Sequence, residues 1–95
     1  MILEHSGRAE ADLGAIFEYL DQRNPRAAAE VLKTIRERVS ELKKQPLTGP
    51  PTRRRGIRCL TITRYPYKVY YSVHGETISI VHIRDSRRAP RMGPR

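Results

Sequence analysis

Residues Gly56 to Arg88, GIRCLTITRYPYKVYYSVHGETISIVHIRDSRR, decide the fold of this 95-residue chain. Their apolar, aromatic and β-branched side chains fall into three short runs, at 57–63, 67–73 and 77–84. Runs of this length and composition predict β-strands. The stretch therefore predicts a small three-stranded sheet in the second half of the chain.

The breaks between these runs predict how the strands pair. Arg64-Tyr65-Pro66 separates the first run from the second, and His74-Gly75-Glu76 forms a tight turn between the second run and the third. Connections this short make the three strands antiparallel neighbours. In the middle run, period-two alternation places Tyr67, Val69, Tyr71 and Val73 on one face and Lys68, Tyr70 and Ser72 on the other. In the last run, it places Ile78, Ile80, His82 and Arg84 on one face and Val81 and Ile83 on the other.

The first half of the chain predicts one strand and two helices. Residues 1–5 predict a strand, which Ser6-Gly7 ends, and Ser6 is a candidate N-cap for a helix over 8–22. Asn24-Pro25 ends this helix and starts a second one that Pro46 stops. A connection this short predicts an antiparallel hairpin. The apolar stripes are Ala9, Leu13, Ile16, Phe17 and Leu20 on the first helix, and Ala28, Val31, Leu32, Ile35, Val39 and Leu42 on the second.

The positive charge is confined to one half of the sequence. Residues 1–45 hold eight acidic and eight basic side chains, whereas residues 46–95 hold two acidic and eleven basic ones, so the whole net charge of +9 belongs to the second half. Arginine outnumbers lysine fifteen to four, and the loop over 46–55 ends in three consecutive arginines. Arginine binds phosphate or carboxylate through a planar fork. The sequence thus indicates a surface for an acidic partner, with a merely solvated basic face as the alternative.

A basic sheet also suggests a nuclease that cleaves phosphodiester bonds. Such cleavage needs proton-transfer groups beside the cations. The proton-transfer groups are scarce. His82 is the best of them, although a mid-strand histidine is more often a packed sheet residue. The histidines and Cys59 lack metal-ligand spacing, so we expect no metal site and no cofactor. The candidate phosphate- or target-binding residues are Arg58, Lys68, Arg84, Arg87 and Arg88, and a nuclease would use Arg58, Arg84 and His82.

Six short motifs, taken together and in this order, resemble the RelE/ParE superfamily of toxins from bacterial type II toxin–antitoxin systems. They cover roughly residues 1–90. The motifs are AxxDLxxIxxYL (9–20), NPxAA (24–28), PxxG (46–49), GxRxL (56–60), YPYKVxY (65–71) and IRDSRR (83–88).

The resemblance implies an α+β fold in which a two-helix antiparallel hairpin packs on one face of a small antiparallel sheet, in the order β-α-α-β-β-β. It favours the ParE side, whose members inhibit DNA gyrase, over the RelE side, whose members cut mRNA on the ribosome. Many superfamily members have a histidine where this chain has Asp85, and no aromatic residue follows Arg88 here. Both departures count against a nuclease, so we expect a protein that is not an enzyme. A non-toxic basic binding module is the third interpretation.

The resemblance also implies a cognate antitoxin as a partner, and the charge asymmetry predicts an acidic antitoxin segment that folds on binding. We expect residues 1–95 to form a single toxin domain with a flexible basic tail at 89–95. One cysteine fits a cytoplasmic location, and no apolar run is long enough to span a membrane. The candidate antitoxin contacts are Leu13, Phe17, Leu20 and Tyr70.

Overall fold

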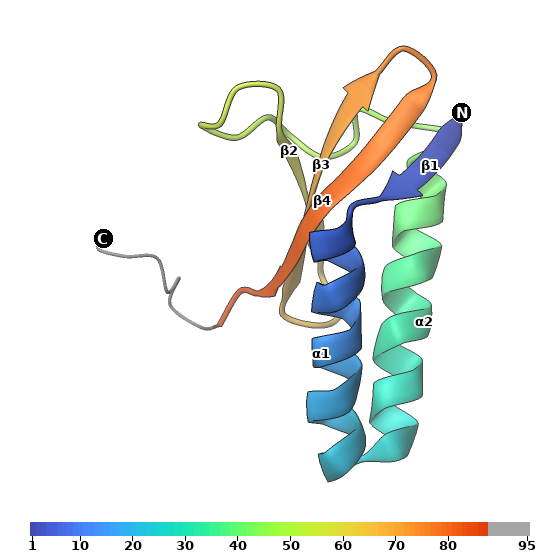
Figure 1. Ribbon diagram of the computed structural model, residues 1–95, viewed down its shortest axis with the longest axis vertical. Coiled ribbons are helices and arrows are strands. Elements are labelled where there is room, and N and C mark those ends of the chain that lie inside the picture. Colours follow the sequence, from blue (N-terminus) through green and yellow to red (C-terminus); the bar gives the residue numbers. More distant parts are fainter. Residues whose placement is uncertain (88–95) are drawn as a thin grey trace.

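The computed structural model describes residues 1–87, so Arg88 and the tail at 89–95 lie outside the described residues. A short strand precedes two helices of equal length, and three further strands follow them (Figure 1). The α+β class and the order β-α-α-β-β-β predicted from the sequence are confirmed. The elements are β1 (Ile2–His5), α1 (Gly7–Arg23), α2 (Pro25–Glu41), β2 (Arg58–Ile62), β3 (Tyr67–His74) and β4 (Thr77–Asp85).

Both predicted N-caps are confirmed. The Ser6 hydroxyl accepts a hydrogen bond from the amide of Ala9 at 3.0 Å, which satisfies one free amide of the first turn of α1. The Asn24 side chain does the same for the amide of Ala27 at 3.2 Å. Asn24 also donates its own amide to the carbonyl of Leu20, so one residue closes α1 and begins α2. The two helices therefore form a tight hairpin.

The sheet has the strand order β1-β4-β3-β2. The pairings of β2 with β3 and of β3 with β4 are antiparallel, as predicted. The first strand differs, because β1 pairs with β4 in parallel, from Ile2 opposite Thr77 to His5 opposite Ile80. Both helices and two strands separate β1 from β4 in the chain, so no hairpin fixes their relative direction. The sheet is thus mixed, with three antiparallel strands and one parallel edge strand.

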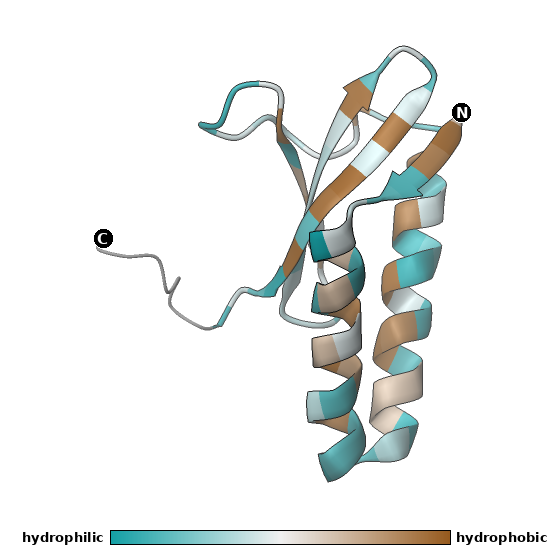
Figure 2. Cartoon of the chain, in the orientation of Figure 1, coloured by the Kyte–Doolittle hydropathy of each residue, from teal (hydrophilic) through white to brown (hydrophobic). Residues whose placement is uncertain are grey.

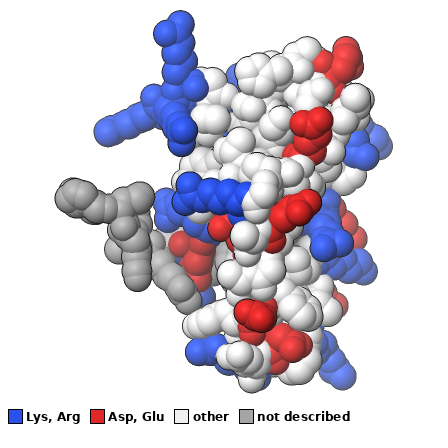
Figure 3. Space-filling view, viewed as in Figure 1, with Lys and Arg blue, Asp and Glu red and all other residues white. Residues whose placement is uncertain are grey.

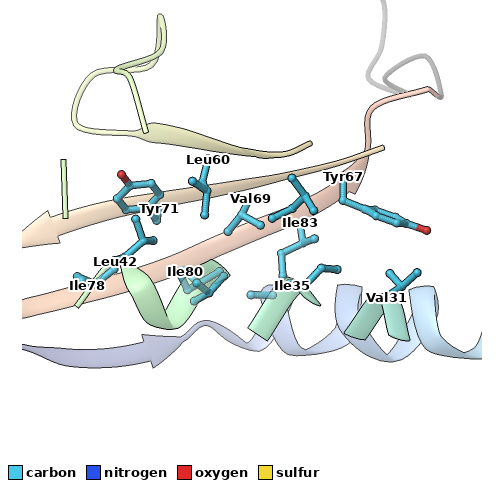
Figure 4. Packing of buried hydrophobic residues seen from close by; sticks show 13 residues of the cluster. Val31, Ile35, Leu42, Leu60, Tyr67, Val69, Tyr71, Ile78, Ile80 and Ile83 are labelled. Carbon is cyan, nitrogen blue, oxygen red and sulfur yellow. The ribbon is translucent and has the colours of Figure 1, made fainter. Parts of the chain in front are cut away.

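The hydrophobic core lies between α2 and one face of the sheet (Figure 4). Val31, Ile35 and Val39 of α2 and its C-cap residue Leu42 are buried, at the four- and three-residue spacing of one helix face. In Figure 2, β4 alternates between hydrophobic and more polar positions, as a strand with one core face should. The buried sheet residues are Leu60, Ile62, Tyr67, Val69, Tyr71, Ile78, Ile80 and Ile83.

A β-bulge changes the faces of the last strand. Tyr71 pairs with Ile80, yet Tyr70 pairs with His82, so Val81 is an extra residue on β4. The predicted sharing of one face by Ile80, His82 and Arg84 is therefore wrong. Beyond the bulge, Ile83 enters the core at 2% exposure, and His82 and Arg84 lie on the opposite face. Sequence alternation alone carries no sign of the inserted residue.

No helix in the described part of the chain is both long and apolar enough to cross a membrane.

Candidate functional site

The structure offers two surfaces on different sides of the protein. The first is a groove of about 1160 Å³ between β1, α1 and α2. Carbon-rich side chains dominate its floor, and charged side chains from both helices stand along it. Its apolar lining includes Leu3, Leu13, Gly14, Phe17, Ala29, Leu32 and Val39, and its charged lining includes Glu10, Lys33, Arg36 and Glu37.

Two residues of α1 suggest that the groove binds another chain. Phe17 leaves 42% of its surface exposed and lines the groove together with Leu13 and Leu32, and contiguous apolar surface of this kind is typical of interaction sites. Gly14 lies in the middle of the helix, where glycine costs about 0.5–1 kcal/mol relative to alanine. A Cβ added at Gly14 would meet no atom within 4 Å, so nothing in the described fold requires glycine there. The open space above Gly14 lets another chain approach the helix backbone closely.

The four candidate antitoxin contacts do not all lie together. Leu13 and Phe17 line the groove, as a shared helix face predicts. Leu20 is half-buried against the core and is not part of the lining. Tyr70 lies on the opposite side of the sheet. The sequence pattern missed the contributions of Leu3 and Leu32, because the approach of β1 to α2 depends on the parallel pairing of β1 with β4.

The second surface is the sheet face that points away from the core, which we call the open face. It is defined by Lys68 and Tyr70 on β3 and by His82 and Arg84 on β4. Lys68 stands directly opposite Arg84, and Tyr70 stands directly opposite His82. The strand register therefore places four of the residues that the sequence analysis considered for chemistry next to one another.

A chain of contacts orients these side chains. The Arg84 guanidinium donates from Nε to the Tyr70 hydroxyl at 3.2 Å. The Tyr70 ring stacks on the His82 ring, with centroids 5.8 Å apart and planes 16° apart. His82 in turn approaches Asp12 of α1, with 2.8 Å between Nδ1 and Oδ2. Each member of this series is thus held by the next.

Asp12 has two roles at this edge of the sheet. The same Oδ2 atom that contacts His82 accepts a hydrogen bond from the backbone amide of Ile83 at 2.9 Å. A carboxylate beside Nδ1 favours the proton on that nitrogen, which leaves Nε2 as an acceptor. The Arg8 guanidinium lies 3.5 Å from Nε2 and suits that assignment. The sequence analysis did not select Arg8 or Asp12, because their contacts with His82 join residues at least 70 positions apart in the chain.

The open face carries an electrostatic conflict. Like charges directly opposite on neighbouring strands destabilise a sheet. Within residues 1–87, neither Lys68 nor Arg84 forms an ion pair with an acidic side chain. The fold therefore holds two unneutralised cations side by side.

The remaining arginine candidates lie elsewhere. Arg58 pairs with Tyr71 on the core-facing side and donates to the carbonyl of Gly49 at 2.7 Å, where it supports the loop before β2. Arg58 and Arg84 are thus on opposite faces, and the suggested nuclease trio with His82 does not converge. Arg87 is exposed and donates to Asp85, and this hydrogen bond raises the pKa of the guanidinium. Arg88 falls outside the described residues.

A metal centre is not evident. Residues 1–87 contain no group of three or more histidine, cysteine, aspartate or glutamate side chains that would hold a metal ion.

Comparisons with known proteins agree with this architecture. A family model described as the ParE toxin of the type II toxin–antitoxin system parDE matches residues 3–90. Among solved structures, a chain of the chromosomal ParDE toxin–antitoxin system from P. aeruginosa matches with a TM-score of 0.79 and 31% sequence identity, over 87% of this chain and 92% of that chain. No curated protein matches the sequence.

These matches show that the chain belongs to a class of proteins, the toxins of type II toxin–antitoxin systems. Within that class the chain belongs to the ParE toxin family. The resemblance noted in the sequence is thereby confirmed on its ParE side.

Proposed function

We propose that this protein arrests bacterial growth by binding DNA gyrase in the cytoplasm, and that a cognate antitoxin neutralises it through the groove between β1, α1 and α2. Membership in the ParE family supports the toxin role. The observation that carries the antitoxin site is the exposed Phe17 beside Gly14 on the wall of that groove.

The groove suits a folded amphipathic segment. An amphipathic helix places one apolar side chain each turn into such a groove. Leu13, Phe17 and Leu32 supply the apolar surface, while Lys33 and Arg36 supply cations for acidic residues at the margin. The net charge of +9 favours fast association with an acidic antitoxin. Phe17 is the expected anchor residue, because aromatic side chains dominate the binding energy of interfaces.

Two assays test the proposal. Induction of the chain without the product of the adjacent reading frame should stop growth, and co-expression of that product should restore it. Purified toxin should inhibit supercoiling of relaxed plasmid by gyrase, and the toxin–antitoxin complex should not. Growth that continues on induction would indicate a non-toxic binding module. Cleavage of ribosome-bound mRNA with gyrase left active would contradict the proposed target.

A groove variant separates the two halves of the proposal. Phe17→Ala should weaken the antitoxin complex by 10-fold or more, since truncation of an aromatic anchor commonly costs about 2 kcal/mol or more. The same variant should still inhibit gyrase if target and antitoxin use different surfaces. The matched control is Tyr19→Ala, which truncates an exposed aromatic residue of the same helix outside the groove lining.

A further inference from the structure

We infer that the open face binds the phosphate backbone of duplex DNA, with Lys68 and Arg84 as the paired phosphate ligands. The inference rests on the proposed function for the source of the DNA, because gyrase acts on a DNA duplex. It assigns to the toxin a contact with the nucleic acid in addition to its contact with the enzyme.

The first argument is the like-charge pair itself. Lys68 and Arg84 are direct cross-strand partners, and no acidic side chain in residues 1–87 forms an ion pair with either. Such a pair lowers the stability of the free fold. Local conflicts of this kind concentrate at functional sites. A bound anion removes the repulsion, since it lies between the two cations and attracts both.

The second argument is that the Arg84 side chain is already oriented. The Tyr70 hydroxyl holds Nε, which leaves the outer edge of the guanidinium for a ligand. That edge carries two amino groups in a plane, and their geometry matches two oxygens of one phosphate. Tyr70 is fixed by its stack on His82, and His82 by Asp12. A preorganised ligand loses little side-chain entropy on binding.

The third argument selects a polyanion over a single carboxylate. No acidic residue occurs between Glu41 and Glu76, so the basic side chains at positions 53–68 have no acidic neighbours in sequence. Arg53, Arg54 and Arg55 are exposed in the loop before β2, and Figure 3 shows Lys and Arg side chains extending where that loop lies. The basic surface is larger than one acidic side chain needs. DNA offers a phosphate about every 3.4 Å along each strand and can contact a row of such cations.

The loop that carries these arginines has a defined shape. The Thr52 hydroxyl donates to the carbonyl of Ile57 at 2.8 Å and accepts from the amide of Arg54 at 3.1 Å. Gly56 has a φ of 80°, a conformation that favours glycine and lets the chain turn back towards β2. The arginine triplet is therefore a second group of cations with a fixed base, and the experiment must separate it from the open face.

The test is fluorescence anisotropy with a labelled duplex of about 20 base pairs and the full-length toxin, over roughly 50–200 mM NaCl. The logarithm of the binding constant falls with the logarithm of salt by about 0.9 for each phosphate neutralised. Lys68→Ala/Arg84→Ala should therefore reduce the slope by about 1.8 and weaken binding at low salt by 10-fold or more. The matched control, Lys44→Ala/Arg26→Ala, removes the same residue types from exposed positions and should weaken binding far less.

Urea unfolding checks that the double variant remains folded. The midpoint of its urea unfolding should stay close to that of the wild type, because loss of the cross-strand repulsion offsets loss of the Arg84–Tyr70 hydrogen bond. Wild-type binding in the double variant would overturn the inference, as would an equal loss in the control. The inference would also be wrong if Arg53→Ala/Arg54→Ala/Arg55→Ala abolished binding while the double variant kept it. Competition by polyglutamate as strong as that by DNA would assign the face to a carboxylate partner and overturn the phosphate assignment.

The inference and the proposed target can fail separately. Inhibition of gyrase by a wild-type toxin that does not bind DNA would overturn only the inference. DNA binding that depends on Lys68 and Arg84, without inhibition of gyrase, would overturn only the proposed target.

Discussion

Asp12 on α1 and His82 on β4 meet across the edge of the sheet, 70 residues apart in the chain and with 2.8 Å between Oδ2 and Nδ1. The contact joins the helix that lines the groove to the strand that carries the open face. Because Asp12 also accepts from the amide of Ile83, it is the main polar link between these two elements.

Replacement of Asp12 should therefore destabilise the fold. Asp12→Ala leaves the Ile83 amide and the His82 ring without their acceptor, and loss of an acceptor for partly buried donors costs about 1–3 kcal/mol. Asp12→Asn keeps one oxygen and should cost less. Urea unfolding at neutral pH measures both free energies. Equal losses for the two variants would contradict a role based on hydrogen bonding. Glu18→Ala, an exposed acidic change on the same helix, is the control.

Tyr71 should stabilise the loop before β2. Its hydroxyl accepts from the amide of Gly49 at 2.9 Å and donates to the carbonyl of Pro46 at 2.7 Å, and the side chain is fully buried. Tyr71→Phe leaves both backbone groups without this partner, so we expect a loss of about 2 kcal/mol in unfolding free energy. Tyr65→Phe, at a half-buried position on the margin of the core, should change the free energy much less.

The contribution of Tyr71 should depend on pH. Burial raises the pKa of the Tyr71 hydroxyl above its ordinary value of 10.0. In the unfolded chain the hydroxyl ionises near pH 10, whereas the folded state keeps it neutral to higher pH. The stabilisation is therefore complete below about pH 10 and is lost as the pH rises through the raised pKa. The stability difference between wild type and Tyr71→Phe should shrink as the pH rises from about 10 through the raised pKa of the hydroxyl. A difference that stays constant over this range would be inconsistent with a buried neutral hydroxyl.

Gly14 should be dispensable for folding and important for antitoxin binding. Gly14→Met should stabilise the free toxin by about 0.5–1 kcal/mol, since methionine has the higher helix propensity and the added Cβ meets no atom. The same side chain enters the groove and should weaken the antitoxin complex by at least 10-fold. Calorimetric titration and thermal unfolding measure the two effects. Ala15→Met, on the same helix outside the groove lining, should leave the affinity unchanged.

Gly49 should be essential for packing. A Cβ at this position would lie 2.7 Å from the carbonyl oxygen of Cys59 and 2.9 Å from Cε1 of the Tyr71 ring. Real side chains do not tolerate such distances, so Gly49→Ala must shift backbone atoms and should destabilise the fold by about 1–3 kcal/mol. Gly7→Ala, where a Cβ has open space, provides the comparison in urea unfolding. Similar stabilities for the two variants would show that the loop relaxes freely.

Local sequence signals predicted most of the fold. Ser6, Asn24 and Pro25 determine helix ends through contacts within three residues, so their roles could be inferred from the chain alone. The three antiparallel strands follow from short turns. The parallel pairing of β1 has no such signal, because its partner lies more than 70 residues away.

The candidate surfaces were predicted less completely. Leu13 and Phe17 share a helix face and were found by periodicity, whereas Leu3 reaches the groove only through tertiary structure. On the open face, Lys68 and Tyr70 follow regular alternation. His82 and Arg84 join them because of the bulge at Val81, and Asp12 joins them from α1 through a contact over 70 residues. Both relationships depend on the assembled sheet rather than on any local pattern.

Other parts of the chain occupy the outer side of β4 as far as Ile83. Ile2 donates to the carbonyl of Glu76, Ser6 to those of Ile80 and Val81, and Asp12 accepts from the amide of Ile83. Unpaired strand edges are where sheets recruit further strands and aggregate. With these groups occupied, a second copy of the toxin cannot pair directly with β4, so the edges left for a further strand are those of β1 and β2. Self-association by strand addition during overproduction would therefore use β1 or β2, and a charged or proline substitution on the solvent face of either strand would hinder it.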